Sequence, residues 1–107
     1  MNGDDRSSDL VHSELGDPEL FAEVVETFLR ELPERLNQLD RVLKSADFQQ
    51  LAQFAHQLKG AGGGYGYPGL TQLAARIEAE AGRPLPSPVV LAELVESLRH
   101  YQARMRA

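Results

Sequence analysis

The chain contains no cysteine and no tryptophan, and it has only two methionines among its 107 residues. Without cysteine there is neither a disulfide framework nor a thiolate metal site, and because an HExxH motif is also absent, a small zinc module is excluded. No apolar run approaches the roughly 18 residues of a membrane span, and residues 1–5 lack the basic and apolar regions of an export signal. We therefore expect a cytoplasmic, soluble protein, free of the membrane, whose one small domain is held together by packing alone.

Positive charge is scarce in the first half of the chain. Residues 1–54 carry 5 basic and 12 acidic side chains, residues 55–107 carry 6 and 4, and the formal net charge is −5. Affinity for nucleic acid comes mainly from Lys and Arg side chains that neutralise phosphates. An acidic chain without a basic stripe is therefore not expected to bind nucleic acid.

Four segments repeat apolar side chains at intervals of three and four residues, and none shows the two-residue alternation of a strand. The segments are residues 18–45, a stretch from about residue 47 with a ragged end among the glycines at 60–66, residues 70–81, and residues 88–105. Short connections between amphipathic helices are typical of antiparallel bundles. The sequence therefore predicts an all-α protein, an antiparallel four-helix bundle over residues 17–107.

Two parts of this bundle allow alternatives. Pro33 interrupts the first long stripe, and because proline removes one backbone donor we expect either a kink or two coaxial pieces there, with the kink favoured by the in-phase stripe that follows. Residues 1–16 are polar apart from Met1, Leu10, Val11 and Leu15. They are expected to form either an arm or a short helix packed on the end of the bundle, of which the short helix is favoured.

One histidine lies on the wrong face of its helix for a core residue. At about 100° per residue, the apolar side chains between Phe48 and Leu58 cluster on one side of the second helix, and His56 falls roughly 150° away from them. Its ring is therefore expected in water. The residues predicted on the same face are small or polar: Gln49, Ala52, Gln53, Lys59, Gly60 and Gly63.

This face has the features of a phosphoryl acceptor. A side chain at position 60 would stand over the imidazole of His56, so glycine there keeps the approach open at a cost in helix stability. Lys59 places an ammonium near the same ring, where it would stabilise an anion transferred onto the imidazole. Neutral imidazole has a usable lone pair near pH 7 and needs no catalytic triad. The chain has no acid cluster with metal-site spacing, so metal chemistry would come from a partner.

The segment Ala55-His56-Gln57-Leu58-Lys59-Gly60, followed by Gly66, Leu70, Leu73 and Ile77-Glu78, resembles the signature of histidine-containing phosphotransfer (HPt) domains of multistep phosphorelays. The resemblance covers about 90 residues, including the long first helix. It implies that His56 accepts a phosphoryl group from a receiver-domain aspartyl phosphate, or from a kinase, and relays it to a response regulator. Lys59 would then steady the phosphoryl oxygens, and Gly60 would keep the approach open.

The resemblance also suggests neighbours for the site. Glu78 occupies the position of a polar residue that faces the histidine, and its distance from the turn matches that of His56. Gln49 and Gln53 would belong to the receiver-docking surface, and Gly63 lies on the same face. Gln57 departs from the family pattern, because Ser or Thr is common there.

The partners implied are receiver domains of response regulators and a hybrid histidine kinase, with Mg²⁺ held by the receiver and no metal or other cofactor on this chain. The protein would be a monomeric phosphocarrier rather than an enzyme. Two alternatives stay open at this point. One is a helical docking module that carries no phosphate, and the other is a detached phosphoacceptor domain of a chemotaxis-type kinase, although a chain beginning at Met1 favours a free-standing protein.

Overall fold

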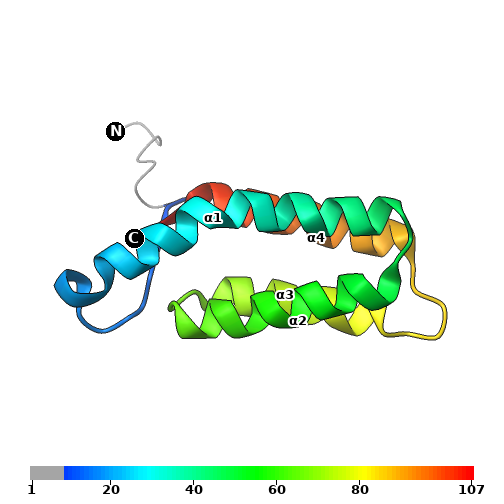
Figure 1. Cartoon of the computed structure of the whole chain (residues 1–107), viewed down its shortest axis with the longest axis horizontal. Helices are drawn as coiled ribbons and strands as arrows, with labels where there is room; N and C mark the ends of the chain where they lie inside the picture. The colour runs from blue at the N-terminus through cyan, green and yellow to red at the C-terminus, as the bar shows by residue number, and fades with distance from the viewer. Residues whose placement is uncertain (1–8) are drawn as a thin grey trace.

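Four helices account for most of the computed structural model, which describes residues 9–107. The helices are α1 (Pro18–Lys44), α2 (Phe48–Gly64), α3 (Pro68–Ala81) and α4 (Pro88–Arg104). Figure 1 shows α1 beside α4 in one layer and α2 beside α3 in the other, with each helix running opposite to the one before it. The all-α class and the helical bundle are therefore confirmed.

Side-chain caps set the starts of three helices. Asp17, Asp47 and Ser87 each accept a hydrogen bond from a backbone N–H in the first turn of α1, α2 and α4, respectively. Such bonds satisfy donors that the helix itself leaves unpaired. The helix α3 has no side-chain cap and begins with proline in its first turn, which suits that position because proline lacks the unpaired N–H. The helix starts expected near residues 47 and 88 are confirmed.

The helix α1 stays continuous through Pro33. Leu32 and Leu36 on either side of the proline are both fully buried, so the apolar stripe faces the same core before and after it. Figure 1 shows α1 changing direction along its length. The interpretation as two separate coaxial pieces is therefore wrong, and a bent single helix is found instead.

The N-terminal segment is extended rather than helical. The two-residue strand β1 (Val11–His12) pairs in parallel with β2 (Met105–Arg106). Further along, the Glu14 N–H donates to the Gly66 carbonyl at 2.7 Å. The short helix predicted within residues 1–16 is thus wrong for residues 10–16, because their backbone groups find partners on β2 and on the α2–α3 turn, at one end of the bundle; residues 1–8 of that prediction lie outside the described residues.

The last helix also ends earlier than its apolar stripe indicates. Helix α4 ends at Arg104, and Met105 is buried as part of β2. Tyr67, which is fully buried at the start of α3, donates its hydroxyl to the Arg106 carbonyl at 2.5 Å. This hydroxyl anchors the C-terminal strand to the α2–α3 turn.

A glycine brings α2 and α3 close together. A Cβ atom on Gly62 would lie 2.6 Å from Thr71 Oγ1 and 2.9 Å from the Thr71 backbone nitrogen, so only glycine fits. The Thr71 hydroxyl in turn donates to the Lys59 carbonyl at 3.1 Å. These contacts fix the register of the two helices that carry the candidate site.

Within the part of the chain that the structure describes, no helix has the length and hydrophobicity to cross a membrane.

Candidate functional site

His56 projects from the middle of α2 into solvent. Its side chain is 66% exposed, whereas Ala55 and Leu58 in the same turn are buried in the core. The exposed position is the one that the helical periodicity predicts. A core role for this histidine is therefore excluded.

Glu78 of α3 joins His56 to Lys59. Its Oε2 lies 2.9 Å from His56 Nδ1, and its Oε1 lies 2.8 Å from Lys59 Nζ. An ionised carboxylate can only accept hydrogen bonds, so Nδ1 is the ring nitrogen that carries the proton. In the neutral ring the lone pair is then on Nε2. Glu78 therefore faces His56, as its place in the chain predicts.

The carboxyl of Glu78 is held in its ionised form. The hydrogen bond from the Lys59 ammonium is the largest influence, and with a smaller contribution from His56 it lowers the pKa of Glu78 below the ordinary value of 4.5. Partial burial acts in the opposite direction and is outweighed. The acceptor role of Glu78 toward both side chains is consistent with this ionised state.

The predicted neighbours of His56 are only partly brought together. A shallow depression next to the imidazole is lined by Ala52, Gln53, Gln57 and Glu78. Gln49 is exposed at the start of α2 and is not among these lining residues. Of the predicted polar neighbours on α2, Gln53 is therefore the one that borders the imidazole.

Two glycines on the predicted face differ in their surroundings. A Cβ on Gly60 would meet no atom within 4 Å. A Cβ on Gly63 would lie 3.9 Å from Thr71 Oγ1, which is an ordinary contact. The fold therefore requires glycine at neither position, in contrast to Gly62.

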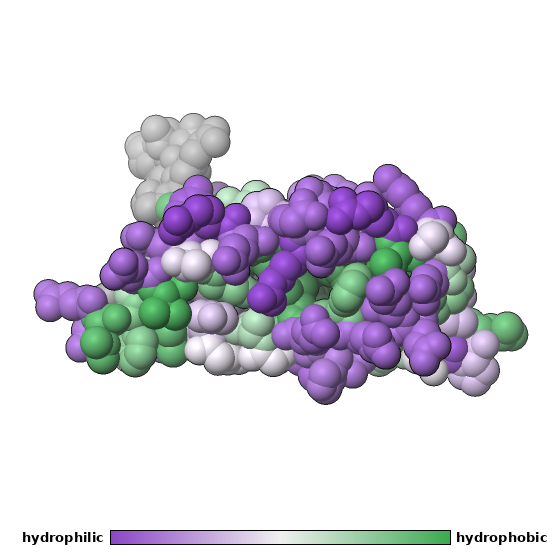
Figure 2. All heavy atoms as spheres, viewed as in Figure 1, coloured by the Kyte–Doolittle hydropathy of each residue, from purple (hydrophilic) through white to green (hydrophobic). Residues whose placement is uncertain are grey.

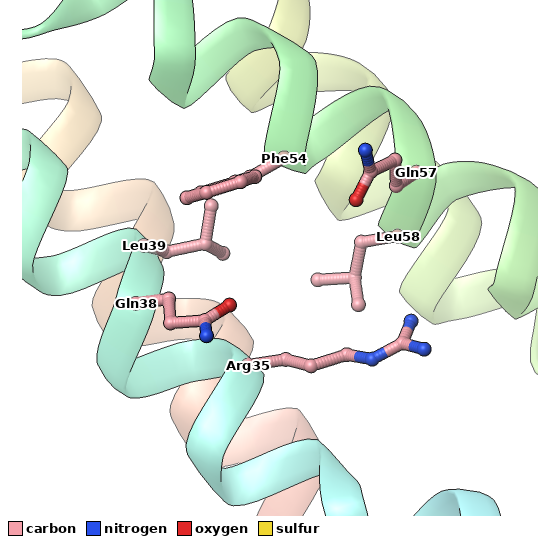
Figure 3. Close-up of a pocket in the computed structure, with 6 residues that line it drawn as sticks. All are labelled: Arg35, Gln38, Leu39, Phe54, Gln57 and Leu58. Carbon is pink, nitrogen blue, oxygen red and sulfur yellow. The ribbon is translucent and has the colours of Figure 1, made fainter.

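A second hollow between α1 and α2 adjoins the site. Its lining residues are Arg35, Gln38, Leu39, Phe54, Gln57 and Leu58. Figure 3 shows the Arg35 side chain reaching from α1 toward α2, with Phe54 across the opening from it. Gln57 borders both this hollow and the depression beside His56, so the two hollows are neighbours on either side of this side chain.

Sequence reasoning missed two features of this region. Arg35 and Gln38 did not stand out, because one long amphipathic helix gives no signal for which polar residues will border another helix. The direct pairing of Lys59 with Glu78 was not foreseen either, although their positions on facing helices could have suggested it. Among residues 9–107, no group of three or more histidine or acidic side chains is placed to hold a metal ion.

The fold and the site together define a helical bundle that displays His56, hydrogen-bonded to Glu78 of the neighbouring helix, at its surface. The family model of the Hpt domain matches residues 23–104, and the chain belongs to this family. Searches of curated proteins and of solved structures gave no match. Hpt domains are phosphotransfer carriers rather than classical enzymes, so the chain has a phosphotransfer-related role among two-component signalling proteins.

Proposed function

We propose that His56 carries a phosphoryl group, which it accepts from a receiver-domain aspartyl phosphate or a kinase and passes on to a response regulator. The observation that supports this role best is the hydrogen bond between His56 Nδ1 and Glu78 at 2.9 Å on an exposed ring. It leaves Nε2 as the nucleophilic nitrogen. Among the hydrogen bonds of residues 9–107, none involves this atom.

The proposed transfer needs few groups from this chain. The Nε2 lone pair attacks the phosphorus, a P–N bond forms, and the bond between phosphorus and the aspartyl oxygen breaks so that the carboxylate leaves. The imidazole ring becomes positively charged during this step. The carboxylate of Glu78, which already accepts the Nδ1 proton, stabilises that charge. Transfer to a second receiver reverses the same bond changes.

Lys59 provides the positive charge next to the incoming phosphoryl oxygens. Its ammonium has three N–H donors, so one can stay on Glu78 while another contacts the phosphoryl group. The same ion pair balances the negative charge of Glu78. A carboxylate near the acceptor nitrogen therefore does not have to repel the phosphoryl group.

Gly60 supports an approach by a large partner. Since a Cβ there would meet no atom within 4 Å, packing inside this chain gives no reason for a glycine in the helix. A glycine in a helix interior costs about 0.5–1 kcal/mol relative to alanine. The open surface beside His56 offers a reason, since a receiver must bring its aspartate and its Mg²⁺ to Nε2.

The partners proposed are receiver domains and a hybrid histidine kinase, and the chain acts in the cytoplasm as a monomer without turnover of its own.

The test uses a receiver domain charged with acetyl phosphate. Incubation with this protein should add one phosphoryl mass, which is lost in acid and survives in base, and His56→Gln should abolish the gain. His100→Gln is the matched control. Its ring is 77% exposed and also lies near a carboxylate, Glu96 at 3.1 Å, so the gain should persist in that variant.

Two results would contradict the proposal. Retention of the mass gain in His56→Gln would place the phosphoryl group elsewhere. Binding to several charged receivers without any mass gain would instead identify a docking module that carries no phosphate.

A further inference from the structure

The N-terminal end of α1 extends past the end of α2. Phe28 of α1 stacks on Tyr65, the residue that caps the end of α2, with ring centroids 4.4 Å apart. Residues 18–27 therefore lie beyond that end, and at 1.5 Å per residue they extend about 15 Å. Figure 1 shows this part of α1 projecting from the bundle, with the N-terminal segment as its neighbour.

The projecting end of α1 displays apolar side chains. Leu20 is 67% exposed and Val24, one turn later, is 50% exposed. On the helical wheel they continue into Phe21 and Val25, which line a hollow between α1 and the segment around Leu15. Figure 2 shows hydrophobic side chains gathered at this end of the molecule. We give the name α1 apolar patch to five residues: Leu15, Leu20, Phe21, Val24 and Val25.

The segments that form the α1 apolar patch carry only acidic charged side chains. Between His12 and Arg30 the sequence has no Lys or Arg, and every charged residue is acidic. These residues are all exposed: Glu14, Asp17, Glu19, Glu23 and Glu26. A second copy of the chain would bring the same acidic rim against this one, and anionic lipid or nucleic acid would be repelled as well. The charge therefore selects a basic occupant.

We propose that the α1 apolar patch docks a basic amphipathic helix of another protein. Apolar side chains of that helix, spaced three or four residues apart, would cover Leu20 and Val24 and enter the hollow, while its flanking Lys and Arg side chains would meet the acidic rim. The patch lies about 25 Å along the bundle from His56. Such a partner therefore leaves the phosphotransfer face open, and docking goes beyond the phosphocarrier role.

The test uses a synthetic 18-residue helix with leucine at every third or fourth position and lysine elsewhere. Fluorescence anisotropy should show binding that weakens with added salt, and the same peptide with glutamate in place of lysine should not bind. In the full chain, amide shifts in two-dimensional NMR should be confined to residues 11–27 and to Ala107, which also lines the hollow. The double variant Leu20→Gln/Val24→Gln should weaken binding at least tenfold.

A matched control is available at the opposite end of the bundle. Leu85 is 88% exposed and Val89 is 68% exposed, so Leu85→Gln/Val89→Gln removes a similar apolar surface without touching the patch. Its affinity for the lysine peptide should equal that of the wild type. Equal weakening in both double variants, or amide shifts centred on His56, would overturn the proposal. A wild-type dimer that becomes a monomer in Leu20→Gln/Val24→Gln would overturn it too, by showing that a second copy covers the patch.

Discussion

Glu78 of α3 accepts a hydrogen bond from His56 Nδ1 at 2.9 Å, and its other oxygen lies 2.8 Å from the Lys59 ammonium. One carboxylate thus sets both the proton position on the imidazole and the place of the nearest positive charge. Because His56 and Lys59 are on α2 and Glu78 is on α3, the arrangement depends on the register between these two helices. Gly62 and Thr71 fix that register below the site.

Removal of the Glu78 carboxylate should slow phosphorylation of His56. In Glu78→Ala nothing holds the proton on Nδ1, so both neutral tautomers become populated and the charged ring loses its acceptor. We expect transfer to slow about tenfold, which corresponds to one hydrogen bond of about 1.4 kcal/mol. Nitrogen chemical shifts of the imidazole should show the change in tautomer directly.

Glu78→Gln is the informative companion variant. Its amide oxygen can still accept the Nδ1 proton, but it cannot form the ion pair with Lys59. It should therefore keep the wild-type tautomer and lose less rate than Glu78→Ala. Equal rates in wild type and Glu78→Ala would show that the carboxylate has no part in transfer.

Lys59 should control the titration of Glu78. The pKa of Glu78 is lowered chiefly by the Lys59 hydrogen bond, so Lys59→Met should return it toward 4.5, and His56→Gln should raise it less. A lowered pKa in the folded state stabilises the protein above the unfolded value, and this stability is lost as pH falls through the folded value. The wild type should therefore lose more stability in acid than Lys59→Met, as measured by urea unfolding. Side-chain carboxyl shifts in NMR give the pKa of Glu78 itself.

Two glycines, two residues apart, should respond in opposite ways to substitution. The Cβ added by Gly60→Ala would lie in open space, so this substitution should stabilise α2 by up to about 1 kcal/mol. Gly62→Ala places a Cβ against Thr71 and should destabilise the bundle by about 1–3 kcal/mol. Urea unfolding measures both changes. A similar loss in both variants would mean that Gly60 also packs inside the chain.

A larger side chain at position 60 tests the access argument. Gly60→Leu should leave the bundle folded and slow transfer from a charged receiver by about 10- to 100-fold, because the partner can no longer align its phosphoryl group. Gly64→Leu is the control, since a Cβ at Gly64 also meets no atom within 4 Å but lies about one turn further along α2 than Gly60 and about two turns from His56. Unchanged transfer in Gly60→Leu would remove the steric explanation.

The sequence predicts the exposed position of His56 because helical periodicity is enough to separate a core face from a solvent face. The approach of Glu78 follows from similar chain distances on either side of one turn. The role of Gly62 could not be separated from that of its glycine neighbours, because it depends on how closely α3 approaches. Local patterns carry no such information between helices.

The strand pair at the chain ends could not be predicted either. Val11 pairs with Met105, and each strand has only two residues, which is too short for any alternation to appear. Met105 also continues the apolar stripe of α4, so periodicity alone extends the helix through it. The extended ending becomes visible only once the partner strand and the hydroxyl of Tyr67 are in place.

Tyr67 should make the anchoring of these chain ends depend on alkaline pH. Burial raises the pKa of its phenol to about 12. A raised pKa in the folded state means that this contribution to stability is complete below the unfolded value near 10 and is lost as pH rises toward 12. Tyr67→Phe should cost about 1 kcal/mol at neutral pH, through the lost bond to Arg106, and should lose less stability than the wild type between pH 10 and 12. Tyr65→Phe is the matched control, because the Tyr65 hydroxyl makes no hydrogen bond within residues 9–107, and it should follow the wild-type alkaline profile. If urea unfolding gave the same alkaline loss in wild type and Tyr67→Phe, the Tyr67 phenol would not be the group that couples the chain ends to pH.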